Sequence, residues 1–242
     1  MSFVAFDDVG VRAADGRAIL DGFTLDVGEG ESVALVGPSG GGKTTALKLV
    51  NALRLPTRGT VRVAGRATTA WDPIALRRNT GYVIQEIGLF PHLTIAENVA
   101  LAPVVAGWAG DVQARGDEML ALVGLARRDF GHRYPHELSG GQRQRVGVAR
   151  ALAAAPRLVL LDEPFAALDP VTRFALQSEF RTLQRRLATT AIFVTHDLRE
   201  ALRVADRVAV VADGRVIVAL GPSDVAASTH PVVHALREAS GL

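Results

Sequence analysis

The sequence of 242 residues contains no cysteine, and this absence excludes disulfide bonds and thiolate metal sites. No apolar run reaches the roughly 18 residues that indicate a membrane-spanning helix, because Arg157 interrupts the richest apolar stretch, 151–161. The N-terminus, Met-Ser-Phe-Val-Ala-Phe-Asp-Asp, lacks the charged and then apolar pattern of a signal peptide. We therefore expect neither a signal peptide nor a membrane span in this chain.

A strong surplus of charge is also missing. The sequence has 27 basic and 25 acidic residues, a formal net charge of +2. Nothing in this balance indicates a basic surface for nucleic acid, so we expect no nucleic-acid partner. The length is sufficient for one large α/β domain with a substantial core, or for such a domain with an added lobe.

A glycine-rich run is the clearest motif that is present. It follows the apolar stretch 32–36, precedes a segment of helical periodicity from Thr44 to Leu53, and satisfies the P-loop pattern. Backbone N–H groups of such a loop cradle phosphates, while its lysine reaches the β- and γ-phosphates and its Ser/Thr hydroxyl binds Mg²⁺. The predicted phosphate-binding residues are Gly37, Pro38, Ser39, Gly40, Gly41, Gly42, Lys43, Thr44 and Thr45.

A glycine-rich turn that matches this pattern by chance is the alternative interpretation. The use of basic residues argues against it, because Lys43 and Lys48 are the only lysines in a chain that otherwise uses arginine. A lysine at position 43 supplies a slim point charge, which suits a cramped phosphate cradle better than the planar guanidinium of arginine.

Two carboxylates follow the apolar run Arg-Leu-Val-Leu-Leu (157–161). If this run is a strand of a doubly wound sheet, Asp162 and Glu163 lie at the sheet edge where such folds bind ligands. We expect Asp162 to hold Mg²⁺, directly or through water, and Glu163 to accept a proton from an attacking water. The alternative is a strand that simply ends in solvated acids.

The run Leu-Ser-Gly-Gly-Gln (138–142) indicates a second anion-binding helix start, with Ser139 as its N-cap. One nucleotide does not need two such cradles in one subunit. With these motifs the chain resembles the ATP-binding cassette ATPases, the motor subunits of ABC transporters. In that family this pentapeptide caps the γ-phosphate bound by the other subunit, so the resemblance assigns nucleotide contacts to Ser139, Gly140, Gly141 and Gln142.

The resemblance extends over nearly the whole chain and implies further roles. Gln85 matches the glutamine that contacts Mg²⁺ and the attacking water. Asp169, in Ala-Ala-Leu-Asp-Pro, matches the loop that crosses the dimer interface. His196, in Val-Thr-His-Asp, matches the switch histidine; it follows the predicted strand 191–195, where it could hydrogen-bond a γ-phosphate or serve a structural hydrogen bond. Glu163, His196 and Gln85 are thus the predicted catalytic residues, and Thr44, Gln85 and Asp162 the predicted Mg²⁺ ligands.

One position departs from the family pattern. The family usually stacks an aromatic side chain on adenine at the position that aligns with Ala13, and no Tyr, Trp or Phe lies between Val9 and Gly22. Phosphate binding is therefore more firmly predicted than adenine recognition.

The apolar patterns predict an α/β fold, a P-loop NTPase core of mainly parallel sheet with a small antiparallel β subdomain and an inserted helical lobe. In this interpretation 1–242 is one ATPase domain, with a core at 1–85 and 157–220, a helical lobe at 86–156 and a short helical tail at 221–242. The expected strands are 3–6, 23–27, 32–36, an edge strand at 59–64, 80–85, 158–161, 191–195, 207–212 and 215–219. The expected helices are 44–53, 94–105, 115–125, 139–154, 170–187 and 197–204.

Three stretches (81–94, 107–108 and 133–139) are similar to importers of osmoprotectants, which are quaternary amines such as glycine betaine, choline and carnitine. Many of those relatives carry C-terminal regulatory CBS domains. This sequence stops at Leu242, so we expect ionic-strength sensing by such domains to be absent from it or to lie elsewhere. An importer for another small solute, and a non-transport cassette ATPase of the DNA-repair or translation type, remain alternatives.

The resemblance implies ATP and Mg²⁺ as cofactors. It also implies a second copy of the chain in an ATP-dependent head-to-tail dimer, transmembrane permease subunits and, indirectly, an extracytoplasmic solute-binding protein. The expected location is the cytoplasmic face of the inner membrane, as a peripheral subunit.

Overall fold

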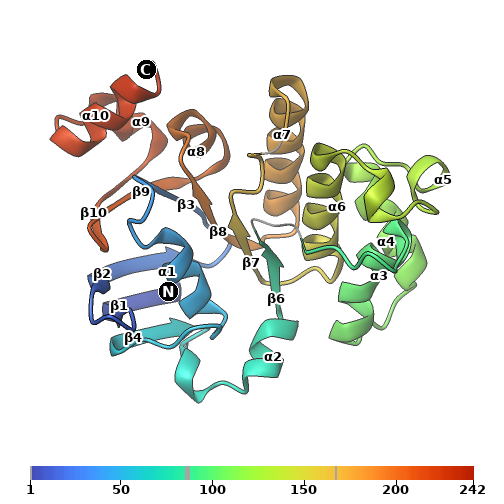
Figure 1. The fold of residues 1–242 in the computed structure, drawn as a ribbon, viewed down its shortest axis with the longest axis horizontal. Coiled ribbons are helices and arrows are strands. Elements are labelled where there is room, and N and C mark those ends of the chain that lie inside the picture. Colours follow the sequence, from blue (N-terminus) through green and yellow to red (C-terminus); the bar gives the residue numbers. More distant parts are fainter. Residues whose placement is uncertain (1, 85–87, 167) are drawn as a thin grey trace. The chain divides into compact units, whose positions relative to one another are not determined.

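The computed structural model describes residues 2–84, 88–166 and 168–242 (Figure 1). The chain divides into two compact units. The first unit comprises Met1–Arg77 and Thr190–Leu242, and the second comprises Arg78–Thr189. In the described part of the chain, no helix is long and apolar enough to cross a membrane.

The first unit contains two groups of strands with the helices that pack on them. Its elements, with α2 at its boundary, are β1 (Ser2–Arg12), β2 (Ala18–Gly28), β3 (Ser32–Val36), α1 (Lys43–Val50), β4 (Arg58–Val63), β5 (Arg66–Ala67), α2 (Pro73–Arg78), β8 (Thr190–Thr195), α8 (Leu198–Val204), β9 (Arg207–Ala212), β10 (Arg215–Leu220), α9 (Pro222–Ala227) and α10 (Pro231–Ala239).

Strand β3 is the centre of the parallel sheet in this unit. It pairs in parallel with β8 on one side and β9 on the other, and β10 adds to β9 in the antiparallel direction. All residues of β3 and β8 are buried. Strands covered on both faces favour apolar side chains at successive positions, which explains the runs Val-Ala-Leu-Val and Ala-Ile-Phe-Val in the sequence.

The small antiparallel sheet has the strand order β2-β1-β4-β5. A hairpin joins β1 to β2, and both strands extend further toward the turn than the predicted ranges 3–6 and 23–27. The rings of Phe6 and Phe23 meet edge to face at 5.1 Å and anchor this pair. The prediction of an edge strand at 59–64 was wrong, because the two-residue strand β5 pairs with the outer side of β4.

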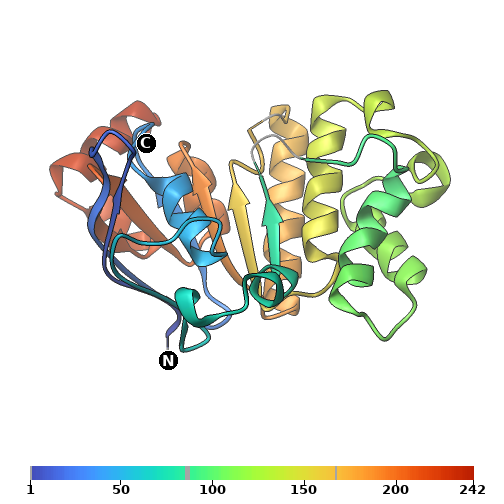
Figure 2. The ribbon, with the colours of Figure 1, turned by 60° about the horizontal axis from the view of Figure 1, so that its bottom comes forward.

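The second unit holds a pair of parallel strands and a group of helices (Figure 2). Its elements are β6 (Thr80–Val83), α3 (Ile95–Ala106), α4 (Val112–Leu122), α5 (Arg127–Phe130), α6 (Gly140–Ala153), β7 (Leu158–Asp162) and α7 (Pro170–Arg186). Residues 88–156, all of which the structure describes, form helices and turns without a strand, as expected for this stretch. Helices α3, α4 and α6 pack against one another.

Candidate functional site: a phosphate cradle and two carboxylates

The glycine-rich loop leaves the carboxyl end of β3 and enters α1. Gly37 has φ 151°, and a Cβ there would lie 1.9 Å from the carbonyl oxygen of Val211 in β9. Gly42 has φ 95°, and a Cβ there would lie 2.9 Å from the carbonyl oxygen of Ile19. Backbone from neighbouring strands therefore excludes side chains at both ends of the loop. Only glycine allows this loop to curl between these strands.

Lys43 begins α1 and lies folded over the loop. Its side chain is buried, with 7% of the residue exposed, and its Nζ donates to the carbonyl oxygens of Gly37 and Pro38, each at 2.7 Å. Thr44 and Thr45 follow in the first turn and are half-buried. Among the described residues, no side chain caps the N-terminus of α1, so its first N–H groups are suited to binding an anion. These features fit a bound phosphate chain.

His196 lies in the same unit as this loop. Strands β3 and β8 pair in parallel with Val36 opposite Thr195, so the residues that follow them, Gly37 and His196, leave the sheet at the same edge. The His196 side chain is exposed, whereas Thr195 is buried. The structure thus brings together the predicted phosphate loop and the predicted switch histidine.

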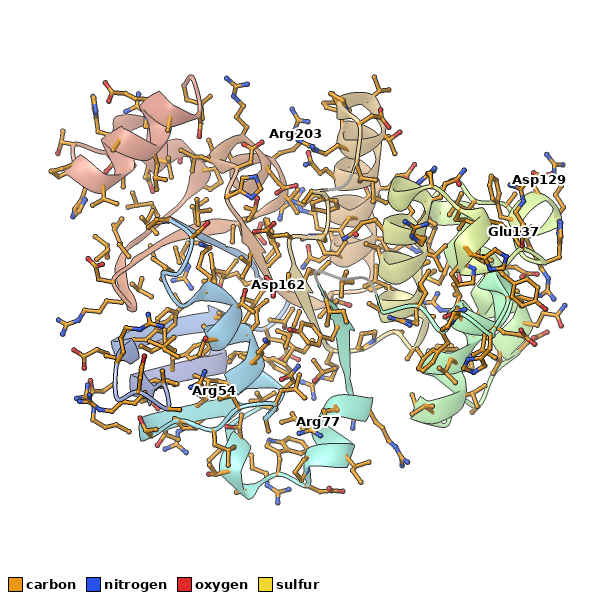
Figure 3. All side chains as sticks on the ribbon, viewed as in Figure 1. Arg54, Arg77, Asp129, Glu137, Asp162 and Arg203 are labelled. Atoms are coloured by element: carbon orange, nitrogen blue, oxygen red, sulfur yellow. The ribbon has the colours of Figure 1, made fainter. Side chains whose placement is uncertain are left out.

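The predicted Mg²⁺ ligand Asp162 ends β7 in the second unit (Figure 3). It is 4% exposed, and its negative charge acts on Tyr82 in the paired strand β6. Burial and this charge together raise the pKa of Tyr82 to about 12. Carboxylate and hydroxyl oxygens are both suitable ligands for Mg²⁺, so Asp162 and Thr44 each have the chemistry that their predicted roles require.

Glu163 follows Asp162 with φ 50°, a left-handed backbone conformation that is uncommon for a residue with a side chain. Its carbonyl oxygen accepts hydrogen bonds from the N–H of Ala166 at 3.3 Å and from Nε2 of Gln144 at 3.4 Å. The following turn is anchored where the ring of Phe165 meets that of Phe180 in α7. Packing and hydrogen bonds therefore hold the predicted base in a strained local conformation, as is common for residues at active sites.

The second predicted cradle is the start of α6. Ser139 caps this helix: its Oγ accepts from the N–H of Gln142 at 3.2 Å, and its own N–H donates to Oε1 of Gln142 at 2.9 Å. Ser139 is exposed, and Gly140, Gly141 and Gln142 are half-buried. The segment 139–142 therefore presents a capped helix start at the surface of its unit.

Asp169 caps α7 by accepting from the N–H of Thr172 at 3.0 Å. Hydrogen bonds from the side chain of Thr172, and less strongly from its backbone N–H, hold the pKa of Asp169 below its ordinary value. Gln85, predicted to bind Mg²⁺ and water, lies outside the described residues.

The loop at residues 88–93 presents an aromatic side chain. Phe90 is 42% exposed, while its backbone N–H and carbonyl oxygen both bond to the side chain of Asn98, at 2.8 and 3.1 Å. Asn98 is fully buried in α3 and also donates to the carbonyls of Leu93 and Thr94. A buried amide thus fixes the loop that exposes Phe90.

Residues 20–166 match the family described as ABC transporter. This chain belongs to the ABC transporter family. It is 48% identical over 88% of its length to the carnitine transport ATP-binding protein OpuCA of Listeria monocytogenes, 53% of which is covered. It is 47% identical over 86% of its length to the osmoprotectant import ATP-binding protein OsmV of Salmonella typhimurium, 55% of which is covered. The chain spans about half the length of these curated relatives.

Solved structures agree with this membership. The dimeric ATP-binding cassette MJ0796 bound to ADP and Pi has a TM-score of 0.83 and 33% identity to this ABC transporter chain, over 90% of this chain and 98% of that one. The predicted fold class, a P-loop NTPase core of mainly parallel sheet with a small antiparallel sheet and helices, is confirmed.

Sequence reasoning missed several polar residues that the structure places beside the predicted functional residues. In the second unit of this ABC transporter chain, Gln144 contacts the backbone of Glu163 and Tyr82 lies near Asp162. In the first unit, Thr195 precedes His196 and its hydroxyl donates to Glu200. A signal existed for Gln144, which shares a helix face with Val148 and Leu152 and so interrupts an otherwise apolar stripe.

Proposed function

We propose that this chain binds ATP with Mg²⁺ and hydrolyses it as the motor subunit of an ABC importer. The observation that carries the proposal is the loop around Lys43, whose glycines are required by the backbone packed against them and whose ammonium lies among the loop carbonyls. Such a loop is built to hold the phosphates of a nucleotide. The names of relatives at 44–48% identity support the transport role.

The proposed mechanism assigns one task to each predicted residue. Loop N–H groups and Lys43 bind the phosphate oxygens, and His196 donates a hydrogen bond to the γ-phosphate. Glu163 accepts a proton from the attacking water, and Gln85 orients that water. Thr44, Asp162 and Gln85 would hold Mg²⁺, which neutralises charge on the phosphates when it is bound.

Replacing Lys43 by alanine tests the ATPase proposal. We expect hydrolysis to fall by at least about a hundredfold, because the change removes a positive charge from the cradle. Lys48→Ala is the matched control, since it removes the other lysine from an exposed position of the same helix. The measurement is phosphate release from Mg-ATP, with circular dichroism to verify folding. A folded Lys43→Ala protein that hydrolyses ATP as fast as Lys48→Ala would refute the proposal.

The proposed partners are a second copy of the chain, transmembrane permease subunits and, through them, a solute-binding protein outside the cell. The chain would then lie at the cytoplasmic face of the membrane. Dimeric relatives support the first partner. The loop that exposes Phe90 supports the second, because an apolar side chain held outward by a buried amide suits a protein interface.

Phe90→Ser tests the permease contact in the assembled transporter. We expect solute uptake to be lost while ATP hydrolysis by the isolated chain is retained. Ile74→Ser is the control, because Ile74 in α2 is an equally apolar side chain that is 57% exposed. Uptake that survives Phe90→Ser would exclude this loop as the coupling contact.

We propose a quaternary-amine osmoprotectant as the solute, following the names of the relatives with 44–48% identity. Import of another small solute is the alternative, because a relative named for sulfate/thiosulfate import in Gloeobacter violaceus is 45% identical over 88% of this chain. Uptake assays of the complex with labelled glycine betaine, carnitine, choline and sulfate distinguish the two.

A further inference from the structure

A closed set of hydrogen bonds surrounds the backbone of His196. The hydroxyl of Thr195, the last residue of β8, donates to Oε2 of Glu200 in α8. The same hydroxyl accepts from the N–H of Asp197 at 3.1 Å. The carboxylate of Asp197 in turn caps α8 by accepting from the N–H groups of Arg199 at 2.8 Å and Glu200 at 3.4 Å. The residues on both sides of His196 are therefore tied to one another.

The burial of this set indicates that its geometry is tightly constrained. Thr195 is 1% exposed and Glu200 is 7% exposed, and the neighbouring residues of α8, Leu198, Ala201 and Val204, are also buried. A carboxylate in such surroundings is costly unless hydrogen bonds satisfy it, so the Thr195–Glu200 bond is expected to persist. Apolar residues at both positions would fill the same space without this cost, and the polar pair therefore calls for a function other than packing.

We propose that Thr195 and Glu200 are positioning residues that hold the peptide of His196, so that the imidazole is aligned with the γ-phosphate. The inference rests on the proposed ATPase function. It assigns no chemical step to either residue. The pair fixes where β8 ends and α8 begins, and His196 is the single residue between Thr195 and the cap Asp197. A shift of about 1 Å at a catalytic group can lower a rate by roughly a hundredfold.

Thr195→Val tests the proposal because it keeps the shape of the side chain and removes the hydroxyl. We expect kcat for Mg-ATP hydrolysis to fall by about tenfold or more, with KM within about twofold, because phosphate binding depends on the loop and Lys43. Thr195→Ser keeps the hydroxyl and should restore the rate. The acceptor of the same hydrogen bond can be changed as well. Glu200→Leu should lower kcat, whereas Glu200→Gln, which retains an acceptor oxygen, should have a kcat closer to that of the natural chain.

Thr190→Val is the matched control. Thr190 is a fully buried threonine at the other end of the same strand, where its hydroxyl accepts from the N–H of Gly30 at 2.9 Å. We expect this variant to lose comparable thermal stability without a change in kcat. Equal losses of kcat in Thr190→Val and Thr195→Val would show a merely structural role and overturn the proposal.

The decisive measurement is kcat of the double variant that combines Thr195→Val with His196→Ala. If the pair acts through His196, Thr195→Val should cost nothing further once the imidazole is gone. Additive losses of rate in the double variant would overturn the proposal. Failure of the natural chain to hydrolyse ATP would instead refute the proposed function, so the two failures are distinguishable.

Discussion

Tyr82 and Asp162 form a pair whose titration is open to direct measurement. Burial, followed by the charge of Asp162, raises the pKa of Tyr82 from its ordinary value of 10.0 to about 12. The chain has only one other tyrosine, Tyr134, so a Tyr134→Phe variant isolates the signal. We expect the phenolate absorbance of that variant to rise near pH 12. Adding Asp162→Asn should lower the midpoint of the Tyr82 titration, because it removes the negative charge that disfavours the phenolate.

The same shift predicts how stability changes with pH. Because the folded chain favours neutral Tyr82, the contribution to stability is complete below pH 10 and is lost as pH rises through about 12. A Tyr82→Phe variant should therefore lose less free energy of unfolding over this interval than the natural chain does, as measured by urea unfolding. Titration of Tyr82 near 10.0 with either residue at position 162 would contradict the proximity of the pair.

Residues with a sequence motif were predictable, and residues that act through a contact were not. The P-loop spacing identified Gly37, Gly42 and Lys43, although the obstacles to side chains at the two glycines come from Val211 and Ile19. Val211 belongs to β9, which pairs with β3, and Ile19 belongs to β2 of the other sheet, so only the folded chain brings them to the loop. Tyr82 was missed for the same reason, since its neighbour Asp162 depends on the pairing of β6 with β7.

At the scale of secondary structure, two helices of the second unit begin with the same capping box. Ser139 and Gln142 start α6, and Thr94 and Glu97 start α3. Ser139→Ala and Thr94→Ala should each destabilise the fold by roughly 0.5–2 kcal/mol, because each leaves a first-turn N–H group without its side-chain acceptor. Thermal or urea unfolding measures both.

The two variants should differ in ATP hydrolysis. Only Ser139 belongs to the segment proposed to cap the γ-phosphate of a second subunit, so Ser139→Ala should slow hydrolysis by about tenfold or more. Thr94→Ala should leave the rate unchanged at temperatures where both proteins are folded. Equal rates in the two variants would mean that Ser139 acts only as a helix cap.

Elements with strong periodicity or unbroken apolar runs were predicted close to their observed limits, as for β8 at 190–195 and α7 at 170–186. The hairpin strand β1 was predicted too short. Asp7 and Asp8 interrupt its alternation, and a shift of register lies between Phe6 and Val9, where Asp8 has φ 45°. A bulge of this kind hides a strand from any pattern of period two.

The tail and the segment after β5 were predicted less well. The tail forms two helices, α9 and α10, where one short helical segment was expected. Each begins with a proline at its first position, a start signal that the sequence did contain. Helix α2 was not predicted at all; it has six residues, of which only Leu76 is buried, too few for a periodic pattern.

At the scale of the whole molecule, the limits predicted for the helical lobe, 86–156, stay a prediction. The second compact unit, Arg78–Thr189, is larger than this lobe, because β6, β7 and α7 belong to it. Sequence periodicity identifies the helices between Gly88 and Pro156, but it cannot show which strands belong to the same compact unit.

The distribution of the predicted nucleotide contacts leads to a prediction about assembly. The chain carries one phosphate cradle around Lys43 and a second helix start at Ser139, which is capped and exposed. A two-fold, head-to-tail pair would let each Ser139 segment cap the nucleotide held by the partner's loop. Two bound ATP molecules would then stabilise the interface, and hydrolysis would weaken it. We expect the natural chain to be largely monomeric without nucleotide.

Glu163→Gln should trap the pair, because it keeps the size of the side chain and the accepting oxygen but removes the proposed base. Light scattering of this variant should show a dimer with Mg-ATP and a monomer without it. Two double variants show which contacts hold this dimer together. Lys43→Ala, which removes ATP binding, and Ser139→Arg, which blocks the exposed helix start, should each restore the monomer when added to Glu163→Gln. Binding of a fluorescent ATP analogue must be measured in parallel, because Ala13 stands where the family places an adenine-stacking aromatic ring. A Glu163→Gln protein that is saturated with ATP and still monomeric would refute the shared site, since the ligand proposed to join the two subunits would then be present without joining them.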